Sequence, residues 1–407
     1  MIKRIKEICD FVSRGATPDY IDEGENKVMN QATFSKGWID DNNIRYTSKT
    51  SKRAQIKKGD LLIASTGGGV LGKVYFYNRN EKNFYADSHV TILRNSKGTN
   101  LMKYLYYHFY LRYDEINATM VKGSTNQTEL QKNYLLSYEL DIPTIEVQKK
   151  MVNYLDTKLT EIDTQVNLLT SKRDAYLRLK KSIINQAVTK GLDPEVKMKA
   201  SGVDGIGEIP EHWDVKRLKD ICTLSPSIKS CSQYKYASFL PMEGLRLGQI
   251  DISDAPVSTL QGKYTPFENN DLLIAKVTPC FENGNIAIAQ GLTNGIGFGS
   301  SEIFVLRAKK VLNIQFLFYM ALSSDFQDKA CSTMCGVGGL KRISPLFMKS
   351  HTITMPPFSE QQDIATYLDE KCSKIDKIVA NLEKQISLYT DMKRSLIDEV
   401  ITGKRAV

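Results

Sequence analysis

The sequence of 407 residues predicts an α+β protein made of two copies of one unit, each a mixed domain followed by a long helix. Three observations predict this fold. A phrase recurs far along the chain, further residues match at the same spacing, and each copy ends in a long stretch with helical periodicity and without glycine or proline.

The repeated phrase fixes the size of the unit. "YLDTKLTEIDTQV" begins at Tyr154 and "YLDEKCSKIDKIV" begins at Tyr367, an offset of 367 − 154 = 213 residues. The same offset aligns other matching residues, namely Lys3, Arg4, Lys6, Ile8 and Cys9 with Lys216, Arg217, Lys219, Ile221 and Cys222. Solenoid repeats are much shorter, roughly 20–50 residues. The offset therefore indicates a duplicated domain pair rather than a solenoid.

The first part of each copy, residues 1–143 and 213–356, predicts a mixed domain. "GDLLIAST", "KVYFYN", "HVTILR" and "EIFVLR" predict strands. "NLMKYLYYHFYLRYDEINATM" and "NIQFLFYMALSSDFQDKA" are predicted to be helical. We expect residues 191–212 to form a linker between the copies.

The second part of each copy, residues 144–190 and 357–403, predicts a long helix. Apolar residues step by three and four, as in a coiled-coil seam. The main seam positions are Leu155, Leu159, Ile162, Val166, Leu169, Leu368, Ile375, Val379 and Leu382. We expect the two helices to pair with each other, although each could instead pack only on its own domain. Lys180 and Lys393 occupy equivalent seam positions and either set the register or mark where the seam frays.

Composition narrows the class of protein. No run of 18 apolar residues predicts a membrane span, and the N-terminus lacks the apolar core of a signal peptide, so we expect a cytoplasmic protein. Seven cysteines form no C-x-x-C pair and four histidines are scattered, so we expect no metal site. The net charge of +9 permits an anionic partner without requiring one.

Several motifs resemble catalytic sequences but lack an essential group. "GGGVLGKV" from Gly67 ends in Val74, where a phosphate-binding loop needs Ser or Thr, and a strand follows instead of a helix. "MPPF" at Met355 lacks the Asn or Asp oxygen that amino-methyltransferases use in this motif. Asp19 and Glu25 share one short polar loop, which does not suit a nuclease metal site. We therefore expect no catalytic residues.

Loops that differ between the copies are the candidate binding sites. "STGGGVLGK" and "KGSTNQTELQK" in the first copy correspond to "KVTPCFENGN" and "CGVGGLKR" in the second. Their polar side chains suit contacts with DNA bases and phosphates, although loops also diverge because they tolerate change. The candidates are Ser65, Thr66, Gly67, Gly68, Lys73, Lys122, Ser124, Thr125, Asn126, Gln127, Lys276, Thr278, Asn283, Asn285, Lys341 and Arg342.

Longer stretches resemble the specificity subunits of type I restriction–modification enzymes. They are "TKGLDPEVKMKASGVDGIGEIPEHWDVKRLKDI", "GDLLIAS", "LKKSIINQAVTKGL" and "MPPFSEQQDIATYLDEKCSKID", and both copies share the layout of that family. The segment "GEIPEHWD" has no counterpart before the first copy.

The resemblance implies a non-catalytic DNA reader. Two target-recognition domains would each bind one half of a split double-stranded site, and two antiparallel helices would set the unread gap. Two methylation subunits would bring S-adenosylmethionine, and motor-nuclease subunits, where present, would bring ATP and Mg²⁺ chemistry. The alternatives are a stand-alone restriction or methylation enzyme and a coiled-coil scaffold that binds no nucleic acid.

Overall fold

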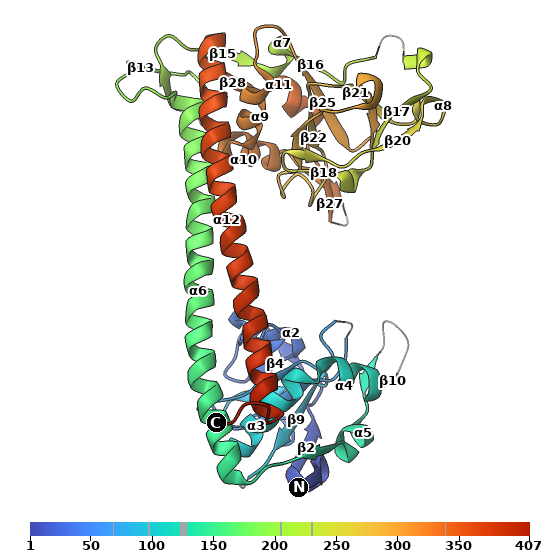
Figure 1. Cartoon of the computed structure of the whole chain (residues 1–407), viewed down its shortest axis with the longest axis vertical. Helices are drawn as coiled ribbons and strands as arrows, with labels where there is room; N and C mark the ends of the chain where they lie inside the picture. The colour runs from blue at the N-terminus through green and yellow to red at the C-terminus, as the bar shows by residue number, and fades with distance from the viewer. Residues whose placement is uncertain (68, 97, 123–127, 204–205, 229–230, 338) are drawn as a thin grey trace. The chain divides into compact units, whose positions relative to one another are not determined.

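The computed structural model describes residues 1–67, 69–96, 98–122, 128–203, 206–228, 231–337 and 339–407. In these ranges the chain forms two compact units (Figure 1). Unit 1 comprises Met1–Leu169 with Lys384–Val407, and unit 2 comprises Thr170–Glu383. Each unit thus contains the mixed domain of one copy together with segments of both long helices.

The central sheet of each unit has the same order and the same directions. In unit 1 the order is β2 (Phe11–Arg14), β9 (Val90–Arg94), β6 (Leu61–Ala64), β7 (Val74–Phe76), and in unit 2 it is β16 (Cys222–Leu224), β25 (Ile303–Ala308), β22 (Asp271–Ala275), β23 (Ile286–Ile288). All neighbouring strands in these sheets are antiparallel. Every residue of β6 and β22 is buried.

A second sheet in each unit shares a parallel strand pair but differs at its edges. In unit 1 the order is β3 (Tyr20–Ile21), β5 (Arg45–Thr47), β4 (Lys27–Met29), β8 (Phe84–Ala86), and in unit 2 it is β20 (Ser253–Pro256), β17 (Tyr236–Leu240), β24 (Ile296–Gly299), β21 (Thr265–Glu268). The parallel pairs are β4–β8 and β17–β24. The segment between Asp19 and Glu25, expected as one loop, contains the short strand β3.

Two-stranded pairs complete the strand inventory. They are β1 (Ile2–Arg4) with β12 (Glu139–Asp141), β10 (Val121–Lys122) with β11 (Glu129–Leu130), β13 (Met198–Ala200) with β14 (Glu208–Pro210), β15 (Asp214–Arg217) with β28 (Thr352–Met355), β18 (Leu245–Arg246) with β19 (Gln249–Ile250), and β26 (Cys335–Val337) with β27 (Leu340–Arg342). Because β13 and β14 pair, the segment expected as a linker is partly structured.

Short helices cover the sheets. In unit 1 they are α1 (Ile5–Ile8), α2 (Gln31–Phe34), α3 (Thr99–Leu111), α4 (Tyr113–Thr119), α5 (Lys132–Ser137) and the 3₁₀ turn η1 (Asp41–Asn43). In unit 2 they are α7 (Leu218–Ile221), α8 (Val257–Leu260), α9 (Ile314–Leu322), α10 (Ser324–Ser332), α11 (Pro345–Ser350) and the 3₁₀ turns η2 (Cys231–Gln233), η3 (Met242–Gly244) and η4 (Thr293–Gly295).

The segments after β9 and after β25 are helical as predicted, and each forms two helices. In unit 1 Arg112 leaves the helical conformation, with ψ near 20°, and separates α3 from α4. In unit 2 Ser323 is extended, and its hydroxyl accepts a hydrogen bond from the backbone N–H of Phe326 at 3.4 Å. Ser323 is therefore the N-cap of α10, a role that serine commonly has.

The two long helices match their predicted positions. Helix α6 spans Ile145–Lys190 (46 residues) and α12 spans Phe358–Ile401 (44 residues). In agreement with the interpretation of Pro356 and Pro357 as strand and helix punctuation, β28 ends at Met355 and α12 begins at Phe358. In the described parts of each unit, segments of α6 and α12 lie side by side (Figure 1).

The seam residues face the partner helix and the mixed domains. Leu155, Leu159 and Ile162 are buried with Leu396, Ile397, Val400 and Ile401 of α12 and with Tyr104 and Tyr107 of α3. Leu368, Ile375, Val379 and Leu382 are also buried, whereas Val166 and Leu169 are half-buried. Ile184 and Ile397, which the seam did not include, are buried because the apolar stripe widens near the domains. Each helix therefore packs on its partner as well as on a domain.

Both lysines of the seam form ion pairs across it. Lys180 Nζ lies 2.6 and 2.7 Å from the two carboxylate oxygens of Asp376 in unit 2. Lys393 Nζ lies 2.7 and 2.9 Å from those of Asp163 in unit 1. The offset of 213 converts one pair into the other, since 180 + 213 = 393 and 163 + 213 = 376. Helix α6 supplies the lysine of one pair and α12 supplies the lysine of the other, as expected for antiparallel helices.

No helix in the described ranges is both long and apolar enough to cross a membrane.

Candidate nucleic-acid interface

In unit 1, the β6–β7 loop (residues 65–73) is joined to the β10–β11 hairpin. Thr66 forms an isolated antiparallel bridge with Glu129. The backbone N–H of Leu130 donates to the carbonyl of Ser65 at 2.9 Å. Two candidate segments that lie about 60 residues apart in sequence therefore meet at one junction, which is the first element of the site.

Unit 2 repeats this junction between the β22–β23 loop (residues 276–285) and the β26–β27 hairpin. Val277 bridges Arg342, and the backbone N–H of Ile343 donates to the carbonyl of Lys276 at 2.9 Å. Ile343 is the counterpart of Leu130, since 130 + 213 = 343. The backbone frame is thus the same in both units, whereas the side chains that it carries differ.

At the unit 1 junction, the Thr66 side chain contacts two other side chains. The Thr66 hydroxyl donates to Gln31 Oε1 at 3.1 Å and lies 2.7 Å from His89 Nδ1. Gly67 has φ of +91°, and a Cβ there would lie 2.7 Å from Gln31 Nε2. A side chain at this position would be strained and would crowd Gln31. The loop therefore starts in a fixed conformation.

At the unit 2 junction the central residue is Thr278, which is buried. Its hydroxyl donates to the carbonyl of Gly339 at 2.8 Å and accepts from the backbone N–H of Lys341 at 3.0 Å. Arg342 binds both carboxylate oxygens of Glu302 at 2.9 Å, and this ion pair holds the pKa of Glu302 below its usual value. The Lys341 side chain is exposed.

Several predicted candidates support the loops instead of projecting into solvent. Ser65 is buried and its hydroxyl lies 2.6 Å from the Thr91 hydroxyl. Lys276 donates to the carbonyl of Ser301 at 2.7 Å, and burial lowers the pKa of its ammonium group. The Thr278 hydroxyl makes the two hydrogen bonds to backbone groups described above. These three residues shape the junctions and are poorly placed to contact DNA directly.

The remaining candidates divide into three groups. Lys122, Asn283, Lys341 and Arg342 are exposed and Asn285 is half-buried, so their side chains are accessible at or beside the junctions. Gly68, Ser124, Thr125, Asn126 and Gln127 lie outside the described residues.

Lys73 forms the third group. It lines a cavity of about 700 Å³ with Trp38, Tyr110 and Tyr113.

Sequence reasoning missed three residues at the junctions, namely Gln31, His89 and Glu302. His89 and Glu302 are equivalent positions, since 89 + 213 = 302, and each directly precedes a strand that is similar in both copies. They follow the matched serines Ser88 and Ser301. A difference in charge at one position of an otherwise matching stretch is the signal that could have identified them.

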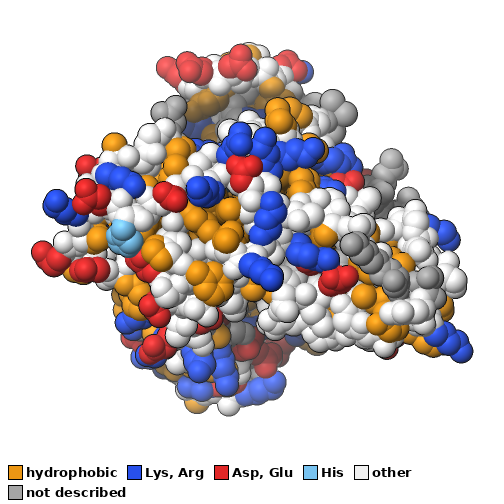
Figure 2. All heavy atoms as spheres, turned by 90° about the horizontal axis from the view of Figure 1, so that it is seen from above, with side chains coloured by type: hydrophobic (Ala, Val, Ile, Leu, Met, Phe, Trp, Pro, Cys, Tyr) orange, Lys and Arg blue, Asp and Glu red, His pale blue; other side chains and the backbone are white. Residues whose placement is uncertain are grey.

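Charge is mixed on the face drawn in Figure 2. Lysine and arginine side chains form small groups among apolar and uncharged ones, and acidic side chains lie mainly near the edges. In the described part of the chain, no group of three or more His, Cys, Asp or Glu residues is arranged to hold a metal ion. At the junctions themselves, the exposed side chains are cationic or hydrogen-bonding, as in Lys122, Lys341 and Arg342.

Comparison with known proteins adds an independent result. The type I restriction modification DNA specificity domain matches residues 1–169 and 210–388, one region in each copy. The EcoAI specificity subunit of Escherichia coli, a type I restriction enzyme subunit, is 31% identical over 198 residues, covering 48% of this chain and 33% of that protein. The aligned part thus spans about a third of the length of that relative.

Two longer matches cover nearly the whole chain. The putative type I restriction enzyme MjaX specificity subunit of Methanocaldococcus jannaschii is 24% identical over 419 residues, covering 99% of this chain and 93% of that protein. A solved structure from work on complex assembly and conformational transition of the type I R-M system has a TM-score of 0.67 at 15% identity and covers 98% of this chain and 97% of its own. That similarity concerns the fold alone. Because the family matches both copies and most of the chain, the protein belongs to the type I restriction modification DNA specificity domain family and carries this domain twice.

Proposed function

We propose that the protein is the sequence-specific DNA-binding subunit of a type I restriction–modification system. Each mixed domain reads one half of a bipartite double-stranded site, and the pair formed by α6 and α12 sets the gap between the halves. The chain itself is non-catalytic. It works in the cytoplasm with partner subunits that carry S-adenosylmethionine, ATP and Mg²⁺.

The observation that carries this proposal is the repeated junction. The hydrogen bond from Leu130 to Ser65 recurs between Ile343 and Lys276, so the frame is the same in both units. The exposed side chains on the two frames differ, with Lys122 on one hairpin and Lys341 and Arg342 on the other. Two domains that recognise different base sequences require the same frame with different polar side chains. The reason is that contacts to bases determine which sequence is bound, whereas the frame only positions the side chains that make them.

Two methylation subunits are the proposed partners of the helices. Leu179 of α6 is 46% exposed and Met392 of α12 is 50% exposed. These residues are equivalent, since 392 − 179 = 213, so each unit carries one apolar position of the same kind. Exposed apolar side chains on a helix suit packing against a further helix. The duplication supports one methylation subunit for each unit, with motor-nuclease subunits as additional partners.

The test is co-expression of the chain with a type I methylation subunit from the same organism, followed by methylome sequencing of the host. We expect adenine methylation at one bipartite motif with a fixed gap, present only when both proteins are expressed. Purified chain alone should bind this DNA with an affinity that falls steeply with salt, and should neither methylate nor cleave it. Methylation at a continuous motif, or methyl transfer by the purified chain without partners, would refute the proposal.

A further inference from the structure

We propose that the ion pairs Lys180–Asp376 and Lys393–Asp163 fix the register of α6 against α12, and thereby the length of the gap between half-sites. This inference rests on the proposed function, because it names the residues that determine one part of the specificity. The two pairs are called register clamps below.

The register clamps place charge where a seam normally has apolar side chains. The Lys180 side chain is only 15% exposed and that of Lys393 only 27%, whereas Asp376 and Asp163 are 54% and 52% exposed. The lysine stems thus lie along the seam and their ammonium groups reach carboxylates at its edge. A polar residue at a core position of a coiled coil specifies register at some cost in stability.

Both clamps define the same register. In antiparallel helices, residues at one level have residue numbers with a constant sum, and here 180 + 376 = 556 and 163 + 393 = 556. The clamps lie in different units, one on either side of the middle of the helices. The equal sums follow from the duplication, because the offset of 213 residues converts one pair into the other, and both pairs therefore belong to one symmetric alignment.

Neighbouring registers lose this pairing. A slip of three or four residues would bring Lys180 to Cys372, Ser373, Val379 or Ala380, and Lys393 to Leu159, Thr160, Val166 or Asn167. None of these residues carries a negative charge. Slips of this size therefore leave both ammonium groups without a carboxylate, which is costly for groups that are largely buried.

Slips of a whole heptad keep apolar residues facing each other in the seam, so within the seam the charges distinguish these registers from the observed one. A slip of seven residues in one direction offers Glu383 to Lys180 but Thr170 to Lys393. In the other direction it offers Asp369 and Asp156, which are already engaged. Asp369 accepts from the Tyr319 hydroxyl at 2.7 Å, and Asp156 accepts from the Tyr107 hydroxyl and from Lys103 Nζ, both at 2.6 Å. The observed register alone satisfies both lysines without breaking other bonds.

The size of a slip gives a sharp expectation for DNA. Seven helical residues span about 10 Å at 1.5 Å per residue. This corresponds to about three base-pair steps of 3.4 Å. Chains without clamps should therefore accept gaps that differ from the native gap by about three base pairs, and not by arbitrary amounts.

The register itself can be measured in the full complex with methylation subunits, independently of DNA. Nitroxide labels at Gln165→Cys and Asp391→Cys, both exposed and with the sum 556, report the alignment by electron–electron distance measurement, after Cys280, Cys331 and Cys335 are replaced by serine. The clamp variant is Lys180→Met with Lys393→Met. The control is Lys158→Met with Lys374→Met, which removes two exposed lysines from the same helices. We expect one distance in the wild type and the control, and a second population in the clamp variant.

The gap is then measured on plasmids that carry the two half-sites with altered spacing. We expect the clamp variant to methylate sites with gaps changed by about three base pairs at least ten-fold more than the wild type does. Lys180→Arg with Lys393→Arg keeps the charges and should restore a single gap. If the methionine variant fails to fold, Asp163→Asn with Asp376→Asn removes the same pairs at exposed positions.

The outcomes separate the two proposals. One distance and one gap in both clamp variants would overturn the register clamps while leaving the proposed function intact. A second distance without any change in gap would overturn the link between register and gap. Absence of bipartite methylation by the wild type would overturn the proposed function itself, whatever the labels show.

Discussion

The buried carboxylate of Asp271 receives two hydrogen bonds from the guanidinium of Arg307, Nε to Oδ1 and Nη2 to Oδ2, both at 2.8 Å. Asp60 and Arg94 form the same pair in unit 1, at 2.6 and 2.7 Å. In each unit the aspartate lies at the start of one central strand and the arginine near the end of its neighbour. The pair therefore joins the two strands at the centre of the frame.

Removal of this carboxylate should destabilise unit 2. Asp271→Ala leaves Arg307 without its buried partner, and we expect a loss of about 3 kcal/mol in the free energy of unfolding. Glu268→Gln removes the half-exposed second partner of Arg307 and should cost less than about 1 kcal/mol. Hydrogen exchange of β22 and β25 amides measures both effects. Equal protection losses in the two variants would contradict the role assigned to Asp271.

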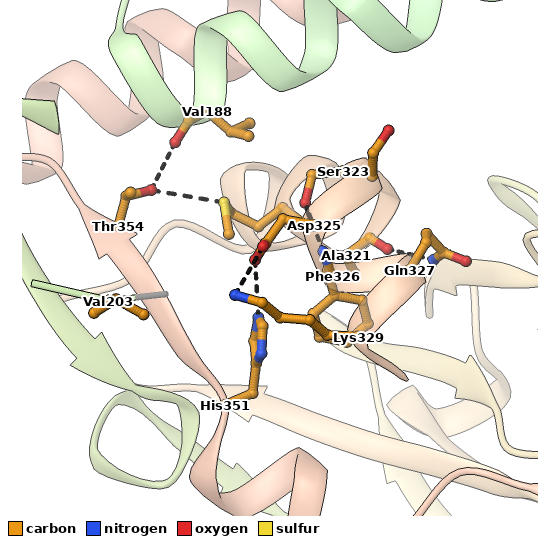
Figure 3. A network of polar contacts seen from close by, with 12 residues as sticks. Val188, Val203, Ala321, Ser323, Asp325, Phe326, Gln327, Lys329, His351 and Thr354 are labelled. Atoms are coloured by element: carbon orange, nitrogen blue, oxygen red, sulfur yellow. Dashed lines mark hydrogen bonds and ion pairs between the residues drawn. The ribbon is translucent and has the colours of Figure 1, made fainter. Parts of the chain in front are cut away.

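Unit 2 should also lose stability in acid because of His351. The imidazole is buried between Phe326 and Phe347, and its Nε2 lies 4.0 Å from Asp325 Oδ2 (Figure 3). Burial lowers the pKa of His351 to about 4. The unfolded chain, with an ordinary histidine pKa near 6.5, binds the proton first, so stability is complete above pH 6.5 and falls as the pH drops toward 4. The loss at pH 4 should reach about 3 kcal/mol.

His351→Phe tests this assignment. Phenylalanine keeps the aromatic packing and cannot be protonated, so thermal unfolding of unit 2 should depend less on pH between 6.5 and 4. Burial likewise lowers the pKa of His108 in unit 1 to about 4, and this contribution should remain. An unchanged pH profile for the unit 2 amides in His351→Phe would show that other groups control the acid sensitivity.

At the candidate interface, Lys341→Ala should weaken DNA binding and reduce the slope of log affinity against log salt by about one, as expected for loss of one phosphate contact. Lys310→Ala is the matched control. Lys310 is exposed and follows the end of β25 that is remote from Glu302 and the junction. Fluorescence anisotropy at several salt concentrations distinguishes the variants. Equal salt slopes for all three chains would remove Lys341 from the interface.

Exchange of one mixed domain should change one half-site. When residues 1–143 are replaced by the corresponding domain of a relative, we expect methylome sequencing to show one new half-site, with the other half-site and the gap retained. The reason is that the bridge at each junction joins two segments of the same unit. A simultaneous change of both half-sites would contradict the assignment of one domain to one half-site.

Lengthening the helices should lengthen the gap. Duplication of "LLTS" after Ser171 adds about 6 Å of helix, nearly two base-pair steps. Because Ser171 lies between the clamp residues Asp163 and Lys180, α12 needs the matching insertion, "NLEK" after Lys384. We expect both insertions together to extend the gap by one or two base pairs with both half-sites unchanged.

Controls for the insertion address the helices themselves. Insertion in α6 alone leaves one clamp unmatched and should give a heterogeneous gap. Ile162→Asp with Ile375→Asp places charges at buried seam positions and should loosen the spacing or unfold the middle of the chain. A folded, active double insertion that keeps the native gap would show that the helices do not measure it.

Features governed by local periodicity were predictable from the sequence. The long helices, the strand β6, and the end of β28 at Met355 follow from apolar spacing and proline chemistry. The break at Arg112 was not predictable, because no glycine or proline marks it. The meeting of Thr66 with Glu129 was also hidden, since bridges between distant loops depend on the assembled sheet. The burial of Ser65 follows from that same pairing.

The buried Asp60–Arg94 and Asp271–Arg307 pairs bear on how such a protein can acquire new targets. They join neighbouring central strands through buried carboxylates. They lie at the ends of β6 and β22 that are opposite to the variable loops. Substitutions in the variable loops therefore leave these ion pairs intact and cost little folding free energy. Under selection for altered DNA preference, the loops can accumulate changes that would unfold a domain whose recognition residues also formed its core.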